Sequence, residues 1–229
     1  MTLGQILHDM WAIFIKYYIG QGLLVKGVLY TLGLAAIAVV CGAVLGSLLA
    51  IGKMSKSKVL GFLITAFVEI MRGTPALLQL YVAYFIIPMI FKALDPSPIQ
   101  CVAIGLSLNS AAYVSEIIRS GIAAVDKGQS EAARALGLTS TSTMLKIVMP
   151  QAIKNILPAL GNEFVMIVKE TSLASTFFVG ELMTTYSIIK GATFSVIPTL
   201  MDIGVIYFIL TFTLSKLLGI AERRMKASA

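Results

Sequence analysis

The chain has 229 residues, of which 58% are hydrophobic and only 13% are charged, and its formal net charge is +7. Soluble domains carry about 25% charged residues, so this composition excludes an ordinary soluble protein and predicts a membrane protein of one domain over residues 1–229. Most lysines and arginines flank apolar runs, which is typical of cytoplasmic loops. The positive charge therefore predicts a lipid membrane as partner, and no nucleic acid.

Residues 1–20 predict an amphipathic helix at the membrane interface. Leu3, Ile6, Met10 and Ile13 fall on one helical face, and Trp11 lies beside them. A short, aromatic-rich helix of this kind is more typical of an interfacial segment than of a span. The residues lack a basic start followed by an uninterrupted apolar core, so we expect no cleavable signal.

Five apolar segments follow, each long enough for the roughly 20 residues that a helix needs to cross a bilayer. They cover residues 22–51, 59–92, 99–124, 157–178 and 196–220. Lys53, Lys56 and Lys58 mark the end of the first segment as cytoplasmic, and the basic tail 222–226 does the same for the last. The expected fold is all-α, with five transmembrane helices, the N-terminus outside and the C-terminus cytoplasmic.

The second segment contains a break between Glu69 and Pro75. Thr74 as an N-cap and Pro75 at the first helical position predict that a helix restarts here, after a turn that Gly73 permits. Glu69 and Arg72 are three residues apart and could pair. These residues are interpreted as gating or structural, with both roles open.

Residues 126–154 predict a structured cytoplasmic loop. A first short helix is expected over Gln129–Leu136, with Gly137 as a left-handed C-cap. Thr139 is expected to cap a second short helix, which Pro150 ends or kinks. A loop of this kind between two spans requires an explanation.

Polar side chains form narrow stripes on the third and fourth segments. A charge near the bilayer centre costs about 2.5 to 3.5 kcal/mol, so it must be paired, face water or bind a ligand. An amino acid zwitterion needs an anion for its ammonium group, which Glu116 or Glu170 could supply, and donors for its carboxylate, from Lys169 and Ser172. The predicted substrate-binding residues are Asn109, Ser110, Tyr113, Glu116, Met166, Lys169, Glu170 and Ser172.

A purely structural interpretation of these stripes stays open. Glu116 could pair with Arg119, and Lys169 with Glu163 or Glu170, because helical neighbours three or four residues apart can meet. The sequence contains no nucleophile and base arrangement, no metal-ligand cluster and no G-x-x-x-x-G-K-[ST] phosphate loop. We therefore expect no catalytic residue, no metal and no ATP site of that type in this chain.

The loop carries a recognisable motif. Glu131-Ala132-Ala133, then Gly137, then Ile147-x-Met149-Pro150 resembles the EAA loop of the membrane subunits of bacterial ABC importers, with Met149 where the family usually has leucine. Three further stretches are similar to the branch of that family that transports polar amino acids. They are Glu69-x-x-Arg72-Gly73-Thr74-Pro75, Asn109-Ser110-Ala111-Ala112-Tyr113-x-x-Glu116-x-x-Arg119, and Gly161-Asn162 with Lys169-Glu170-Thr171-Ser172-Leu173.

This resemblance covers about residues 22–226 and implies a permease subunit of the type I ABC importer fold, in the bacterial plasma (inner) membrane. It implies two cytoplasmic ATPase subunits that bind ATP and Mg, an extracytoplasmic amino-acid-binding protein, and a homodimer or a heterodimer with a homologous permease. This chain itself would hold no cofactor. In the family the loop docks in a groove of the ATPase, which assigns coupling to Glu131, Ala132, Ala133, Arg134, Gly137 and Pro150.

The implied function is import of a polar amino acid by alternating access, driven by ATP hydrolysis in the partner subunits. A self-contained secondary transporter or channel is the alternative, although such a carrier would not require the loop and the chain shows no inverted halves. A third possibility is a scaffold whose own cavity is inert. Three carboxylates, Glu116, Glu163 and Glu170, against Lys169 favour a neutral or cationic substrate. Glutamine, arginine, lysine, histidine and cystine all remain open.

Overall fold

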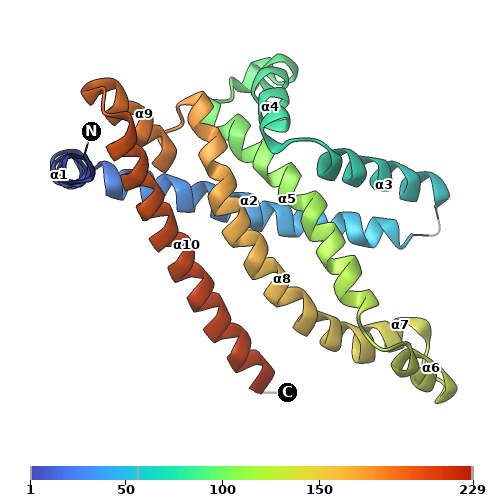
Figure 1. Ribbon diagram of the computed structural model, residues 1–229. Helices are drawn as coiled ribbons and strands as arrows, with labels where there is room; N and C mark the ends of the chain where they lie inside the picture. The colour runs from blue at the N-terminus through green and yellow to red at the C-terminus, as the bar shows by residue number, and fades with distance from the viewer. Residues whose placement is uncertain (1, 56, 228–229) are drawn as a thin grey trace.

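The computed structural model describes residues 2–55 and 57–227, and every regular element in these ranges is a helix (Figure 1). The all-α prediction is confirmed. Lys56, which was expected to mark a cytoplasmic loop, lies outside the described residues. The helices are α1 (Leu3–Ile13), α2 (Leu23–Lys53), α3 (Lys58–Gly73), α4 (Ala76–Ile90), α5 (Pro98–Ala123), α6 (Lys127–Ala135), α7 (Ser140–Thr143), α8 (Met149–Glu170), α9 (Leu182–Thr193) and α10 (Val196–Ala227). Two π segments are present: Phe14–Ile19 extends α1, and Met144–Val148 precedes α8. Two 3-10 segments are present as well: Lys92–Leu94 follows α4, and Thr171–Phe177 follows α8.

Three helices are long and apolar enough to cross a membrane: α2, α5 and α10. The pair α3 and α4 meets the same criterion together, but its two halves are bent by 113°. The described residues thus hold three or four candidate spans. Their bounds agree with the apolar segments predicted at 22–51, 59–92, 99–124 and 196–220.

The segment predicted at 157–178 differs from the structure at both ends. Helix α8 begins earlier, at Met149, and ends at Glu170. Beyond Glu170 the hydroxyls of Thr171, Ser172 and Ser175 each donate to a carbonyl three residues back. Local hydroxyl bonds of this kind compete with the i to i−4 pattern, and the chain continues here as a 3-10 helix.

Helix α2 packs closely along α5 through small residues. A Cβ added at Gly42 would lie 2.6 Å from Ser110 Oγ, and one at Gly46 would lie 2.7 Å from the Ala111 carbonyl oxygen. Ala38, Gly42, Gly46 and Ala50, spaced four residues apart, are all buried. Small residues at this spacing let two helices approach within membranes, so these positions serve packing.

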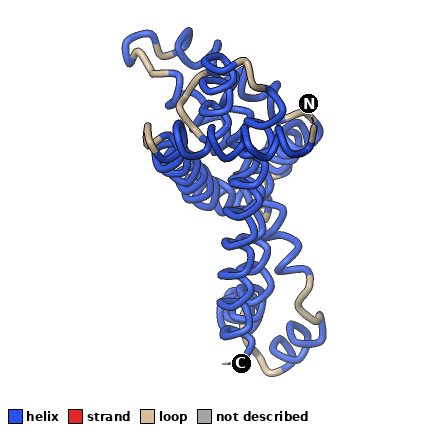
Figure 2. Tube along the Cα trace, turned by 60° about the vertical axis from the view of Figure 1, so that its left-hand side comes forward, coloured by secondary structure: helices blue, strands red, loops and turns tan. Residues whose placement is uncertain are grey.

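The two ends of the molecule are built from different elements. Figures 1 and 2 show α6, α7 and the C-terminus at one end, whereas α1 and α9 lie at the other. Helix α1 and its π extension pack against α9 and α10, with Ile13 and Tyr18 buried. Leu3 and Trp11 on α1 are exposed.

Candidate functional site

The break between α3 and α4 is held by Gln79. Its Nε2 donates to the Met71 carbonyl at 2.7 Å, to the Thr74 carbonyl at 3.1 Å and to Thr74 Oγ1 at 2.9 Å. Its Oε1 accepts a hydrogen bond from Asn109 Nδ2 on α5 at 2.8 Å. A helix end leaves carbonyls without partners, and the buried Gln79 satisfies them while it fixes α4 to α5.

Thr74 does not cap α4, so that prediction is wrong. Its hydroxyl donates to the Ile70 carbonyl at 2.8 Å, and α4 starts at Ala76 after Pro75. In the last turn of a helix a threonine hydroxyl reaches the carbonyl four residues back, and this local bond competes with capping. Among the described residues no ion pair joins Glu69 to Arg72; the Arg72 guanidinium instead lies 5.8 Å from the centre of the Tyr113 ring.

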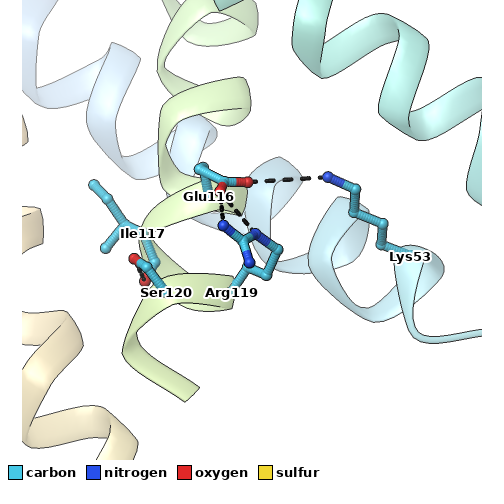
Figure 3. A network of polar contacts seen from close by, with 5 residues as sticks. All are labelled: Lys53, Glu116, Ile117, Arg119 and Ser120. Atoms are coloured by element: carbon cyan, nitrogen blue, oxygen red, sulfur yellow. Dashed lines mark hydrogen bonds and ion pairs between the residues drawn. The ribbon is translucent and has the colours of Figure 1, made fainter. Parts of the chain in front are cut away.

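Glu116 is the centre of an ionic network (Figure 3). Arg119, one turn along α5, donates to Glu116 Oε1 from Nε at 2.7 Å and also from Nη2. Lys53, the last residue of α2, places Nζ 3.9 Å from Glu116 Oε2. The pair between Glu116 and Arg119 is therefore present, and Glu116 lies near the ends of α2 and α5 instead of at the middle of the span.

The other predicted residues of α5 differ in accessibility. Asn109 and Ser110 are buried, and the Ser110 hydroxyl lies against Gly42 of α2 and faces Glu163 of α8. Among the described residues that hydroxyl has no well-formed hydrogen bond. Tyr113 is partly exposed. Of the four predicted residues on this helix, Tyr113 and Glu116 are accessible to a ligand and the other two are buried.

The polar residues of α8 divide between two faces. Met166 and Lys169 are exposed, whereas Glu163 is buried and Glu170 is half-buried. Within the described part of the chain, Glu163 Oε1 and Glu170 Oε2 have no hydrogen-bond partner, and no ion pair joins Lys169 to either carboxylate. Ser172 uses its hydroxyl to donate to the Lys169 carbonyl at 2.6 Å. The structure thus places Glu163 and Glu170 on one side of α8, and it leaves Lys169 exposed and without an ion pair to either carboxylate.

The connection between α8 and α10 is organised by Glu181. This side chain is fully buried, caps α9 by accepting from the amides of Met183 (2.5 Å) and Thr184 (2.7 Å), and accepts from the Tyr207 hydroxyl of α10 at 3.2 Å. Burial raises the pKa of Glu181 above its ordinary value, and these donors offset part of the rise. The Leu182 amide donates to Thr31 Oγ1 of α2 at 3.0 Å. Helix α9 is thereby tied to α2 and α10.

The predicted loop helix is present and capped at both ends. Asp126 accepts from the Gly128 amide at 2.7 Å at its start. At its end Gly137 adopts φ +84°, its amide donates to the Arg134 carbonyl at 3.0 Å, and the Leu138 amide donates to the Ala133 carbonyl at 3.1 Å. These two bonds with a left-handed glycine are the Schellman motif. The prediction of Gly137 as C-cap is confirmed.

The second half of the loop departs from prediction at Pro150. Thr139 caps α7 by accepting from the Ser142 amide at 3.2 Å, as expected. Pro150, however, does not end this helix: α7 ends at Thr143, the chain continues through the π turn into α8, and Pro150 lies in the first turn of α8. Proline is tolerated there, since amides in the first turn have no partner within the helix.

The residues assigned to coupling have unequal exposure. Glu131, Ala132, Arg134 and Gly137 are exposed, whereas Ala133 is buried. Ala133 belongs to the packing inside the loop, and Glu131, Ala132 and Arg134 form the surface that the loop presents.

Sequence reasoning missed Gln79 and Glu181 as organising residues. A single glutamine four residues after Pro75, in an otherwise apolar helix, was a usable signal. Glu181 follows a glycine with φ +83° and precedes a threonine three residues on, a pattern typical of a helix start. Its burial against α2 and α10 had no local signal.

A protein-family model described as "Binding-protein-dependent transport system inner membrane component" matches residues 42–227. The chain belongs to this family. It is thus a multi-pass permease subunit of the inner membrane and not an enzyme in its own right. ATP in such ABC systems is bound by partner ATPase subunits. The described residues contain no group of three or more His, Cys, Asp or Glu that could hold a metal ion.

Named relatives cover nearly the whole chain. A Rickettsia felis protein assigned as glutamine transport system permease protein GlnP is 41% identical over 94% of this chain and 99% of its own length. The arginine transport system permease protein ArtQ of Bacillus subtilis is 35% identical over 90% of this chain and 93% of its own. A crystal structure of an amino acid ABC transporter with histidines matches with a TM-score of 0.86 and 41% identity, over 92% of this chain and 98% of that one.

Proposed function

We propose that this chain is the membrane subunit of an ATP-driven importer that brings a polar amino acid of the glutamine or basic class into the cell. The family, the relatives assigned to glutamine and arginine transport, and the similarity to an amino acid ABC transporter support this proposal. Five spans are assigned to α2, the pair α3–α4, α5, α8 and α10, with the N-terminus outside and the C-terminus in the cytoplasm. Residues 1–20 lie at the outer interface, and residues 126–154 form the cytoplasmic coupling loop.

The observation that carries the proposal is the construction of this loop. It holds a short helix, α6, which is capped at both ends and exposes Glu131, Ala132 and Arg134. After the turn at Gly137 a second helix, α7, runs through the π turn into α8. A rigid element that presents such a surface and leads directly into a span suits the transfer of a partner's motion. Closure of two ATPase subunits on ATP would move α6, and α8 would follow as a rigid body.

The substrate site is assigned to the accessible polar residues of α5 and α8. Lys169 supplies a cation for the substrate carboxylate, with Ser172 beside it, and Glu170 supplies an anion for the ammonium group. Tyr113 and Met166 offer exposed, largely apolar surface for the side chain. The walls of this substrate site are supported by Asn109, Ser110 and Glu116, because each of them is buried against a neighbouring helix or forms an ion pair with one. Two copies, as homodimer or heterodimer, and an extracytoplasmic binding protein complete the assembly.

Reconstitution of the complete transporter in liposomes tests the proposal. Uptake of the amino acid that the binding protein captures should require ATP inside the vesicle together with the ATPase subunits. Uptake that persists without ATP and follows an ion gradient would favour a secondary transporter instead.

The site assignment is tested separately. Glu170→Gln and Lys169→Met should each abolish uptake while the complex still assembles. Lys92→Met, a change at an exposed residue outside the proposed site, serves as the control and should leave uptake unchanged. Normal uptake in both site variants would refute the cavity assignment and leave the importer standing, with this cavity inert.

A further inference from the structure

An apolar groove lies between α2, α5 and α8 at the end of the bundle next to the loop. Its volume is about 410 Å³, and it is lined by residues from Ala43 on α2 to Met54, just beyond the end of α2, and from Met149 to Leu160 on α8. Each stretch advances 11 residues, or about 16 Å at about 1.5 Å per residue. The hydrocarbon core of a bilayer is about 30 Å thick, so the groove has the depth of one leaflet.

The groove lies on the opposite side of its helices from the proposed substrate site. At about 100° per residue, the groove positions Val114, Ile118 and Ile122 of α5 are centred roughly 170° from Tyr113 and Glu116. On α8 the groove positions are centred roughly 150° from the positions of Met166 and Lys169. The groove therefore opens away from the substrate path.

A second, more polar hollow of about 290 Å³ continues the groove at the ends of α2 and α5. The two share Ala50, Met54, Ile118 and Ile122. The polar hollow adds Lys53 and Arg119, the two cations that face Glu116 in Figure 3.

This end of the groove carries an excess of positive charge. One carboxylate, Glu116, faces both Lys53 and Arg119, and Arg72 is also close enough to interact with it electrostatically. Arg119 uses Nε and Nη2 for Glu116, which leaves the Nη1 group for another acceptor. A guanidinium presents five N–H donors and an ammonium three, so one carboxylate does not saturate this pair.

We propose that α2, α5 and α8 form a binding site for a phospholipid with an anionic headgroup. An acyl chain fills the groove, and Lys53 and Arg119 bind the phosphate. Basic pockets between membrane helices on the cytoplasmic side are suited to such headgroups. The site borders Met149, the first residue of α8, which lies within the loop of residues 126–154. A bound lipid there contacts the bundle at the point where loop motion enters it.

Tryptophan quenching by brominated lipids tests this proposal, because the chain has a single tryptophan, the exposed Trp11. In a Trp11→Phe background, Ile51→Trp places a reporter at the exposed edge of the groove. Leu217→Trp on α10 places a matched reporter on an exposed face outside the groove. The full chain is reconstituted in phosphatidylcholine vesicles with increasing fractions of dibrominated phosphatidylglycerol or dibrominated phosphatidylcholine.

The quantity compared is the ratio of apparent lipid affinities, phosphatidylglycerol over phosphatidylcholine, obtained from the quenching curves. At Ile51→Trp this ratio should be about five or more, as expected for one or two basic contacts at a membrane surface. The Leu217→Trp reporter should show a ratio near one. Adding Lys53→Gln with Arg119→Gln should bring the Ile51→Trp ratio close to one. Lys216→Gln with Arg223→Gln removes the same charge from exposed positions of α10 and should leave that ratio unchanged.

Lys53→Gln alone keeps Arg119 bonded to Glu116, so it reports on the headgroup even if the double variant does not fold. This single change should lower the ratio at Ile51→Trp to a value between that of the unaltered site and one. Equal quenching by both lipids at Ile51→Trp would overturn the proposal. Absence of quenching by either lipid there, with normal quenching at Leu217→Trp, would also overturn it, because the groove would then be covered by protein.

Discussion

The loop at one end of the molecule and the connection at the other end both hold short helices between longer ones, but they are held differently. The loop helix α6 is capped by Asp126, Gly137 and Leu138, all within a few residues of it. Helix α9 is held by Glu181 bonded to Tyr207, and by Leu182 bonded to Thr31, which is 151 residues away in sequence. The loop is thus a self-contained element with a free surface, and α9 is part of the bundle. The predictions below test this contrast.

The largest effect is expected for Glu181→Ala. The change leaves the amides of Met183 and Thr184 and the hydroxyl of Tyr207 without an acceptor in a buried site. Each such group costs about 1 to 3 kcal/mol, so the free energy of unfolding should fall by about 4 kcal/mol. Denaturant unfolding of the purified protein in detergent micelles measures it.

The exposed Glu69 supplies the matched control for this change. Glu69→Ala should alter the free energy of unfolding by less than about 0.5 kcal/mol. A loss of similar size in both variants would show that Glu181 does not fix α9 to the bundle.

A smaller decrease in the free energy of unfolding is expected for Thr31→Val. The change keeps the shape of the side chain but removes the acceptor of the Leu182 amide. A buried amide without a partner costs about 1 to 3 kcal/mol. Hydrogen exchange should show faster opening of α9, with little change in α6. The exposed Thr213 gives the control, because Thr213→Val should affect neither helix.

The same contrast explains which parts of the structure the sequence could predict. Gly137, Asp126 and Thr139 act on neighbours in the chain, so the predicted loop helices and the glycine cap agree with the structure, apart from the position of Pro150. Gln79 and Glu181 act between segments that are distant in sequence. No local pattern encodes those partners, and the same limit applied to the orientation of Glu163 toward Ser110.

Gly137→Val should affect the loop alone. Gly137 has φ +84°, where an ordinary side chain costs about 1 to 2 kcal/mol and a β-branched one is especially unfavourable. The strain should loosen the end of α6 and lower ATP-driven uptake relative to ATP hydrolysis in the reconstituted transporter. Asparagine tolerates this conformation, so Gly137→Asn should retain most of the coupling. Equal coupling in both variants would place the coupling element elsewhere.

The smallest effect on stability, and the sharpest test of the contrast, is expected for Glu131→Lys. Glu131 is exposed on α6, and a surface substitution of this kind changes the free energy of unfolding by about 0.5 kcal/mol or less. If the loop exists to present its surface to a partner, reversing this charge should still reduce the ratio of substrate imported to ATP hydrolysed. Lys127→Glu, an opposite reversal at the exposed first residue of the same helix, controls for charge in general. A loss of coupling without a loss of stability is expected only where a residue serves an interface, whereas at Glu181 the two losses should occur together.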